Sequence, residues 1–240
     1  MHQNSMELEE RAFVLVVTVG KKHRLDIFGS MRMNKCLYII MCGGNYHSEP
    51  KALRIVKGEP LVSRTIRLLQ QNGVTDIAIT SNDERFEQFG VPVLHHKNTF
   101  GDGGHWLEGF YPTIDPACYL FGDVFFSSKA IKTIVETETD DVQFFATSIP
   151  NFHKRWAEPF GFKVADQEHF QTAIQEAIYL ADHGHFFREP IAWELWQVIK
   201  ETPLNHIIYT NYKSINDYSC DIDSEEEYQN LKAFLEEIEE

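Results

Sequence analysis

Residues 36–51 read CLYIIMCGGNYHSEPK, and the rest of the chain is organised around this stretch. Its first half is apolar and ends at Gly43 and Gly44, a pattern typical of a buried strand that turns into a loop. Glycine lets the backbone of such a loop come close to a ligand. Lys51 then brings a cation to the same edge, which in an open α/β sheet is where phosphates bind. The stretch therefore predicts an anion-binding loop after the first strand.

Helical and strand patterns alternate after Lys51. Pro60 and Gly73 are typical of the start and the end of a helix, and apolar runs bounded by polar residues predict strands. The predicted elements are a helix at 60–72, a strand at 76–80, a short helix at 83–89 and a strand at 91–95. Such alternation implies a parallel sheet with right-handed crossovers.

Residues 117–126, ACYLFGDVFF, predict a second buried strand, which ends in Gly122-Asp123. The carboxylate of Asp123 is then expected at the same sheet edge as Lys51. Ser127 or Ser128 would cap the helix that follows. The alternative is structural, since aspartate after glycine is also common in turns.

Residues 216–227, NDYSCDIDSEEE, form a third informative stretch. Asp221 and Asp223 lie two positions apart, so on a strand both side chains point to one face. Ser224 and Glu227 form a capping box, which predicts that the last helix begins here. Strands at 142–147, 160–164 and 206–209 and helices at 170–181 and 189–199 are predicted between the second and third stretches.

These three stretches, in this order, resemble the nucleotidyltransferases that activate sugar phosphates, choline phosphate and similar alcohol phosphates. That family begins with an apolar strand, a Gly-x-Gly-x-Arg loop, and Pro-Lys before another apolar strand. The counterparts here are Gly43-Gly44, Pro50-Lys51 and the run 52–56, without the loop arginine. The Gly-Asp at 122–123 and the Asp-Ile-Asp-Ser at 221–224 match its later motifs, so the resemblance spans residues 34–235.

The resemblance implies a fold, an activity and metal ligands. The fold is α/β, a Rossmann-like three-layer sandwich with a mostly parallel central sheet of the nucleotide-diphospho-sugar transferase type. The activity is Mg²⁺-dependent transfer of a nucleotidyl group from a nucleoside triphosphate to a phosphorylated sugar or alcohol, with release of pyrophosphate. Lys51 is expected to be the catalytic cation, and Asp123 and Asp223 to be the magnesium ligands. Because two anions must meet, positioning and charge neutralisation are the protein's main task.

The resemblance also suggests where both substrates bind. The expected nucleotide-binding residues are Cys42, Gly43, Gly44, Asn45, Gly101, Asp102, Gly103 and Gly104. The second substrate is expected at Trp156, Glu158 and Trp193, with Trp106, Trp196 and Glu194 as further candidates. A quaternary-ammonium pocket would need several aromatic faces around one cation, and a role in the hydrophobic core is the alternative for these aromatic residues.

Composition narrows the choice of partners. The net charge of -14 disfavours nucleic acid and anionic membranes, so the expected partners are small molecules. Four cysteines without a C-x-x-C pair fit reduced thiols in a cytoplasmic protein.

Residues 33–240 are expected to form the nucleotidyltransferase domain. Residues 1–32 are expected to be an N-terminal extension, either an edge strand at 13–19 or poorly ordered.

Other functions remain open. An A-type glycosyltransferase also joins a nucleotide-binding sheet to an Asp-x-Asp motif, but there the motif lies mid-chain rather than before the last helix. A non-catalytic nucleotide-binding regulator would explain why the loop arginine is missing. In an active enzyme, His47, Arg54 and Lys57 are the candidates to replace that arginine. A dinucleotide-dependent oxidoreductase is disfavoured, because G-x-G-x-x-G does not follow the first strand.

Overall fold

The computed structural model describes residues 36–237, except 48, 96–103 and 149–155. The chain divides into the units Met1–Met33 and Asn34–Glu240, and only the second contains described residues. The expected extension at 1–32 and its edge strand therefore lie outside the described residues. Among the helices of the described part, none has the length and apolar character needed to cross a membrane.

A seven-stranded sheet forms the centre of the Asn34–Glu240 unit, in the order β12-β10-β11-β8-β1-β6-β7. Parallel pairs join β1 to β6 and β8, β6 to β7, and β10 to β12, whereas β11 runs antiparallel to both of its neighbours. The mostly parallel sheet is as predicted. Its strands are β1 (Leu37–Met41), β6 (Ile77–Thr80), β7 (Val93–Leu94), β8 (Ala117–Phe121), β10 (Val142–Thr147), β11 (Pro159–Val164) and β12 (Lys213–Ile215).

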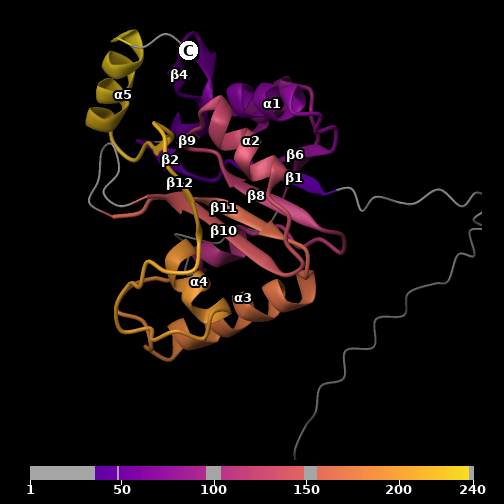
Figure 1. Cartoon of the computed structure of the whole chain (residues 1–240), viewed down its shortest axis with the longest axis vertical. Coiled ribbons are helices and arrows are strands. Elements are labelled where there is room, and N and C mark those ends of the chain that lie inside the picture. The colour runs from indigo at the N-terminus through magenta and orange to yellow at the C-terminus, as the bar shows by residue number, and fades with distance from the viewer. Residues whose placement is uncertain (1–35, 48, 96–103, 149–155, 238–240) are drawn as a thin grey trace, which may run out of the picture. The chain divides into compact units, whose positions relative to one another are not determined.

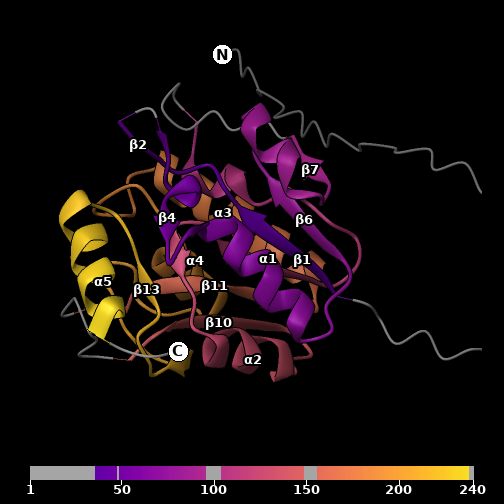
Figure 2. The same ribbon diagram turned by 90° about the horizontal axis from the view of Figure 1, so that it is seen from above.

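Helices cover both faces of this sheet, which gives the three layers seen in Figure 1. One face carries α1 (Leu61–Gln71) and α2 (Ser128–Glu136), and the other carries α3 (Gln167–Asp182) and α4 (Ala192–Ile199). The last helix, α5 (Glu225–Glu237), lies beside the small hairpins at one end of the sheet in both Figure 1 and Figure 2. The short elements are η1 (Lys51–Leu53), η2 (Glu84–Phe89), η3 (Trp106–Gly109), β2 (Asn45–Tyr46), β3 (Glu49–Pro50), β4 (Ile55–Val56), β5 (Glu59–Pro60), β9 (Val124–Phe125) and β13 (Cys220–Asp221).

The continuous apolar runs reflect burial on both faces of the sheet. Every residue of β8 is buried, and Ile39 and Ile40 of β1 have no exposed surface. Aromatic side chains fill the layer between the sheet and α3, where the rings of Phe144 and Phe162 stack with their centroids 4.5 Å apart. Burial of one such side chain contributes ~1.5–3 kcal/mol, so this layer is a main source of stability.

A second, smaller core holds α5 in place. Leu231 and Leu235 of this helix pack against Phe125 and Ile222, and all four are buried. The extended chain from β13 into the next residue places Cys220 and Ile222 in this core, so the two aspartates that flank Ile222 face away from it. Docking of α5 therefore sets the direction of both carboxylates.

The sequence located the five α-helices and most strands, and Ser127 caps α2 as predicted. The strand predicted at 206–209 is wrong, because that segment is irregular and β12 follows it. Side chains of α4 bond carbonyls at both ends of this segment: Gln197 donates to the carbonyl of His206, and Trp196 donates to that of Thr210, the residue after it. Side chains from one helix thus replace a strand partner.

Candidate active site

An open cleft of about 1050 Å³ lies at the carboxyl ends of β1, β6 and β8. One wall comes from the loop after β1 and from η1, and the opposite wall comes from residues 156–159, residues 187–193 and the irregular segment before β12. The lining includes Gly43, Gly44, Asn45, Lys51, Thr80, Trp106, Asp123, Trp156, Glu158, Arg188, Trp193, Tyr209, Asp221 and Asp223. This position agrees with the general location of ligand sites in open α/β sheets.

Lys51 enters the cleft from η1. Its backbone N–H donates to the carbonyl of Gly44 at 2.9 Å, which closes the short hairpin after β1. Its ammonium donates to Asp223 Oδ1 at 2.7 Å and to Asp123 Oδ2 at 3.3 Å. The Lys51 side chain is only 15% exposed, so these two carboxylates are its main electrostatic partners.

Asp123 reaches the cleft because a glycine precedes it. The N–H of Gly122 donates to the carbonyl of Met41 at 2.9 Å, which joins the ends of β8 and β1. A Cβ at position 122 would lie 2.7 Å from that carbonyl oxygen and 2.8 Å from the Cys42 sulfur. Only glycine fits this contact, and the next residue is therefore held at the sheet edge.

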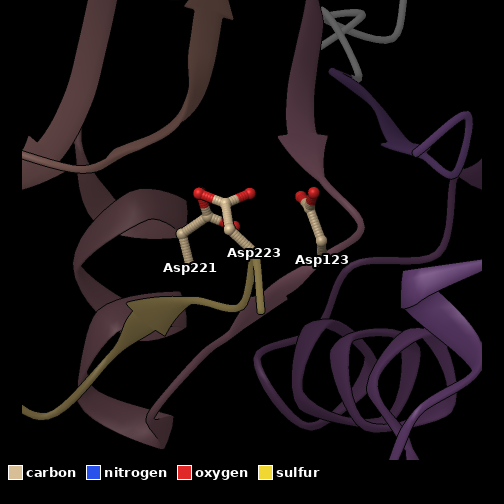
Figure 3. A group of neighbouring side chains, drawn as sticks. All are labelled: Asp123, Asp221 and Asp223. Carbon is tan, nitrogen blue, oxygen red and sulfur yellow. The ribbon is translucent and has the colours of Figure 1, made fainter. Parts of the chain in front are cut away.

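Asp221 and Asp223 approach Asp123 through the pairing of β13 with β9. Asp221 pairs with Val124, and the N–H of Ile222 donates to the carbonyl of Asp123 at 3.2 Å. One carboxylate oxygen from each aspartate lies within 4.8 Å of the others. Figure 3 shows the three side chains pointing into one space, from β13, the loop after it, and the turn after β8. The shared face expected for Asp221 and Asp223 is confirmed.

Charge is unevenly balanced in this group. Burial acts to lower the pKa of Lys51, but the nearby carboxylates of Asp123, Asp223 and Asp221 outweigh it and raise that pKa. Burial raises the pKa of Asp123, which Lys51 opposes and Asp223 reinforces. The ammonium is thus held charged beside three acidic groups.

The chain after Asp223 is anchored by the predicted capping box. Glu227 Oε2 accepts from the N–H groups of Asp223 and Ser224 at 2.8 and 3.1 Å, and the N–H of Glu227 donates to Ser224 Oγ at 3.2 Å. Arg54 donates to the carbonyl of Ser224 at 2.9 Å. Arg54 therefore stabilises the chain after Asp223 and does not line the cleft. His47 and Lys57, the other two candidates for the missing arginine, do not line it either.

The three residues expected at the second substrate all line the cleft. Trp156 is 50% exposed at its rim, whereas Glu158 and Trp193 are 1% and 3% exposed. Glu158 also accepts a weak hydrogen bond from the N–H of Asp221 at 3.4 Å, so this wall is joined to the acidic group. Trp106, one of the further candidates for this substrate, also belongs to the lining.

Two further candidates lie elsewhere. Trp196 is 2% exposed and its indole donates to the carbonyl of Thr210. Glu194 accepts from the Arg188 guanidinium at 2.5 Å and from the N–H of Ile191 at 3.2 Å, which caps α4. Both residues have structural roles, and neither lines the cleft.

Of the two loops expected to bind the nucleotide, the structure describes residues 42–45 of the first and only Gly104 of the second. Gly43, Gly44 and Asn45 line the cleft, whereas the side chain of Cys42 is buried beneath it. The predicted base-binding residues Gly101, Asp102 and Gly103 lie outside the described residues. Gly104 is described but does not belong to the lining. Base recognition at this loop stays a prediction.

Sequence reasoning missed three polar residues of the cleft. The spacing of Asp221 and Asp223 predicts a shared face, but the resemblance assigns only Asp223 as a ligand. Thr80 ends β6, and the rule that parallel strands present ligands at their carboxyl ends could have found it. Arg188 lies in a loop without periodicity, so no local signal marked it.

No protein-family model matches the chain, and no curated protein matches it. A solved structure described as a glucose-1-phosphate thymidylyltransferase from Bacillus anthracis is similar with a TM-score of 0.56 and 16% identity, over 85% of this chain and 96% of that one. A 4-diphosphocytidyl-2C-methyl-D-erythritol synthase from Anaerococcus prevotii has a TM-score of 0.51 and 15% identity, over 85% and 97%. A CMP:2-keto-3-deoxy-manno-octonic acid synthetase complexed with CTP has a TM-score of 0.50 and 12% identity, over 85% and 99%. The chain therefore has the α/β fold of these nucleotidyltransferases, as its sequence predicted.

Proposed function

We propose that the protein is a nucleotidyltransferase, which couples a nucleoside triphosphate to a phosphorylated sugar or alcohol and releases pyrophosphate. The observation that carries this proposal is the meeting of Lys51 with Asp123 and Asp223 at the sheet edge, through hydrogen bonds of 3.3 and 2.7 Å. These groups come from three distant parts of the chain. The similarity of the fold to those of solved nucleotidyltransferases supports the same class of enzyme.

The three aspartates are the proposed site of Mg²⁺. Their carboxylate oxygens gather within 4.8 Å of one another, and hard oxygen donors of this kind are what Mg²⁺ prefers. The donor set therefore fits the ion that the fold family suggests. When bound, Mg²⁺ would neutralise phosphate charge and orient the triphosphate.

The residues of the chain itself account for positioning. A phosphomonoester oxygen attacks the α-phosphorus, a new phosphoanhydride bond forms, and the bond to the departing pyrophosphate breaks. Lys51 supplies a point cation for the phosphates, and the backbone around Gly43 and Gly44 lines the cleft beside it. Gly44 also leaves room, since a Cβ there would lie 3.3 Å from Asp123 Oδ2.

The opposite wall is the proposed position of the phosphorylated acceptor. Trp156 and Trp193 offer apolar surface there, Glu158 offers one buried carboxylate, and Trp106 is a further aromatic residue of the lining. Aromatic faces beside a carboxylate suit an ammonium group, whereas sugar hydroxyls need several polar partners. An acceptor panel should therefore contain both chemical types.

A pyrophosphate-release screen tests the proposal. Each of the four common nucleoside triphosphates is combined with sugar 1-phosphates, choline phosphate or glycerol phosphate in the presence of Mg²⁺, with Asp123→Asn as the inactive control. Release that depends on both substrates and is lost in the control is the expected result. Hydrolysis of a nucleotide sugar without pyrophosphate release would favour a glycosyltransferase. Triphosphate binding without turnover on any acceptor would favour a non-catalytic regulator.

A further inference from the structure

The ammonium of Lys51 is bonded to the same carboxylates that are proposed to hold the metal. It donates to Asp223 Oδ1 at 2.7 Å and to Asp123 Oδ2 at 3.3 Å, and the Asp221 carboxylate belongs to the same group. Three carboxylates carry a formal charge of about -3 when ionised, and the ammonium reduces it to about -2. Lys51 thus weakens the negative potential that would attract a divalent cation.

We propose that Lys51 is an internal counter-cation that competes with the divalent metal for Asp123 and Asp223, and leaves these carboxylates for the phosphates when metal and nucleotide bind. This inference rests on the proposed function and concerns the order in which its ligands bind. Metal binds weakly to the free protein, because Lys51 has first to be displaced. Arrival of a triphosphate gives the ammonium another anionic partner, so nucleotide and metal strengthen each other's binding.

The surroundings of Lys51 fix its backbone and leave its side chain able to exchange partners. Its N–H is bonded to the carbonyl of Gly44, and its carbonyl accepts from the N–H of Arg54 at 3.0 Å. Arg54 is in turn bonded to Ser224, so η1 is attached to the chain that carries Asp223. The ammonium is at the end of a four-carbon stem with three donors, two of which contact the carboxylates.

The position of Gly44 supports an exchange between carboxylates and phosphates. A Cβ at this residue would lie 3.3 Å from Asp123 Oδ2 and 3.7 Å from Lys51 Cδ. The loop after β1 thus runs directly along the Lys51–Asp123 pair at Gly44. A short movement of the side chain, without movement of η1, would transfer the ammonium to an anion on that loop.

Binding of Mn²⁺ to the protein without nucleotide tests the competition. Free Mn²⁺ is measured by electron paramagnetic resonance for wild type, Lys51→Met and Lys51→Arg. We expect Lys51→Met to bind Mn²⁺ about tenfold more tightly or better, because a neighbouring positive charge is gone, and Lys51→Arg to stay close to wild type. Lys129→Met is the matched control, since it removes one charge from the exposed surface of α2 and should leave the affinity unchanged. Equal or weaker binding by Lys51→Met, or no Mn²⁺ binding by any of these proteins, would overturn the proposal.

A second measurement uses the wild-type protein, in case Lys51→Met does not fold. Limited acylation at fixed pH, followed by mass spectrometry of the peptides, reports how accessible each lysine amine is. Saturating Mg²⁺ should increase modification of Lys51 at least about twofold relative to Lys129, since its ammonium loses two carboxylate partners. Unchanged or reduced modification contradicts the exchange. Both experiments omit nucleotide, so their outcome is independent of whether pyrophosphate is released in the substrate screen.

Discussion

The ammonium of Lys51 lies 2.7 Å from Oδ1 of Asp223, although the two residues are 172 positions apart in the sequence. Their contact depends on α5, because the small core under this helix directs the chain around Ile222. Arg54 adds a second link between the same two segments through Ser224. The site is therefore complete only when the last helix is docked on the hairpins that follow β1.

Removal of either charge at the centre of the site should abolish most of the activity. For Lys51→Ala and Asp123→Asn we expect a rate of pyrophosphate release lower by about a hundredfold or more, as is common when one preorganised electrostatic group is lost. The two variants should differ in stability. Lys51→Ala leaves the three carboxylates without their ammonium and lowers the melting temperature, whereas Asp123→Asn removes one repelling charge and does not. Activity within a few-fold of wild type in either folded variant would remove its assigned role.

Gly44→Ala separates activity from stability. Gly44 does not have a positive φ, so alanine causes no backbone strain, but its Cβ would lie 3.3 Å from Asp123 Oδ2. We expect pyrophosphate release to fall by about tenfold or more, because displacement of a catalytic group by a fraction of an ångström is costly. The unfolding midpoint in urea should change little. An active Gly44→Ala enzyme would show that the loop after β1 does not run beside Asp123 during turnover.

The sequence predicted the parts of this protein that depend on local pattern. The apolar run before Gly43, the Gly122-Asp123 turn and the Ser224–Glu227 capping box are each visible within a few residues, and each takes its expected place. The rule that parallel strands share a carboxyl edge predicted that Asp123 lies near Lys51. The joining of Lys51 to Asp223 followed from the family resemblance alone, because β13 pairs antiparallel with β9 outside the main sheet.

The opposite wall of the cleft could not be predicted from local sequence pattern. Arg188 and Tyr209 belong to irregular segments. Side chains of α4 hold both segments, through Glu194 to the Arg188 guanidinium and through Gln197 and Trp196 to the carbonyls of His206 and Thr210. Residues 207–209, Ile-Ile-Tyr, are β-branched or aromatic and favour a strand, yet Trp193 packs edge-on against Tyr209 with centroids 4.8 Å apart and holds the segment on the helix. Tertiary packing overrode a weak local preference for strand.

Trp156 at the rim should matter for the acceptor and not for folding. Its side chain is 50% exposed, so Trp156→Ala removes little buried surface and should leave the melting temperature unchanged. We expect the KM for the acceptor to rise about three- to tenfold, the range typical of one aromatic contact, while the KM for the triphosphate stays the same. Tyr179→Ala is the matched control, because Tyr179 is 60% exposed on α3 and does not line the cleft. A rise in both KM values, or in neither, would contradict a position at the acceptor.

His105 should make stability depend on pH. Its ring nitrogens lie 3.0 Å from Glu189 Oε1 and 3.1 Å from Asp182 Oδ1, and its backbone N–H donates to Glu108 Oε2. Burial acts to lower the pKa of His105, but hydrogen bonds to Glu189 and Asp182 outweigh it and raise that pKa. The stabilisation is therefore complete below the pKa of about 6.5 in the unfolded chain and disappears as the pH rises through the higher value of the folded state. In urea denaturation we expect His105→Gln to reduce the free energy of unfolding by about 0.5–1 kcal/mol at pH 5.5, with the partial exposure of both carboxylates taken into account, and by much less at pH 9. Asp182→Asn should remove part of the same pH-dependent difference. An equal loss at both pH values would mean that His105 stabilises η3 by packing rather than by charge.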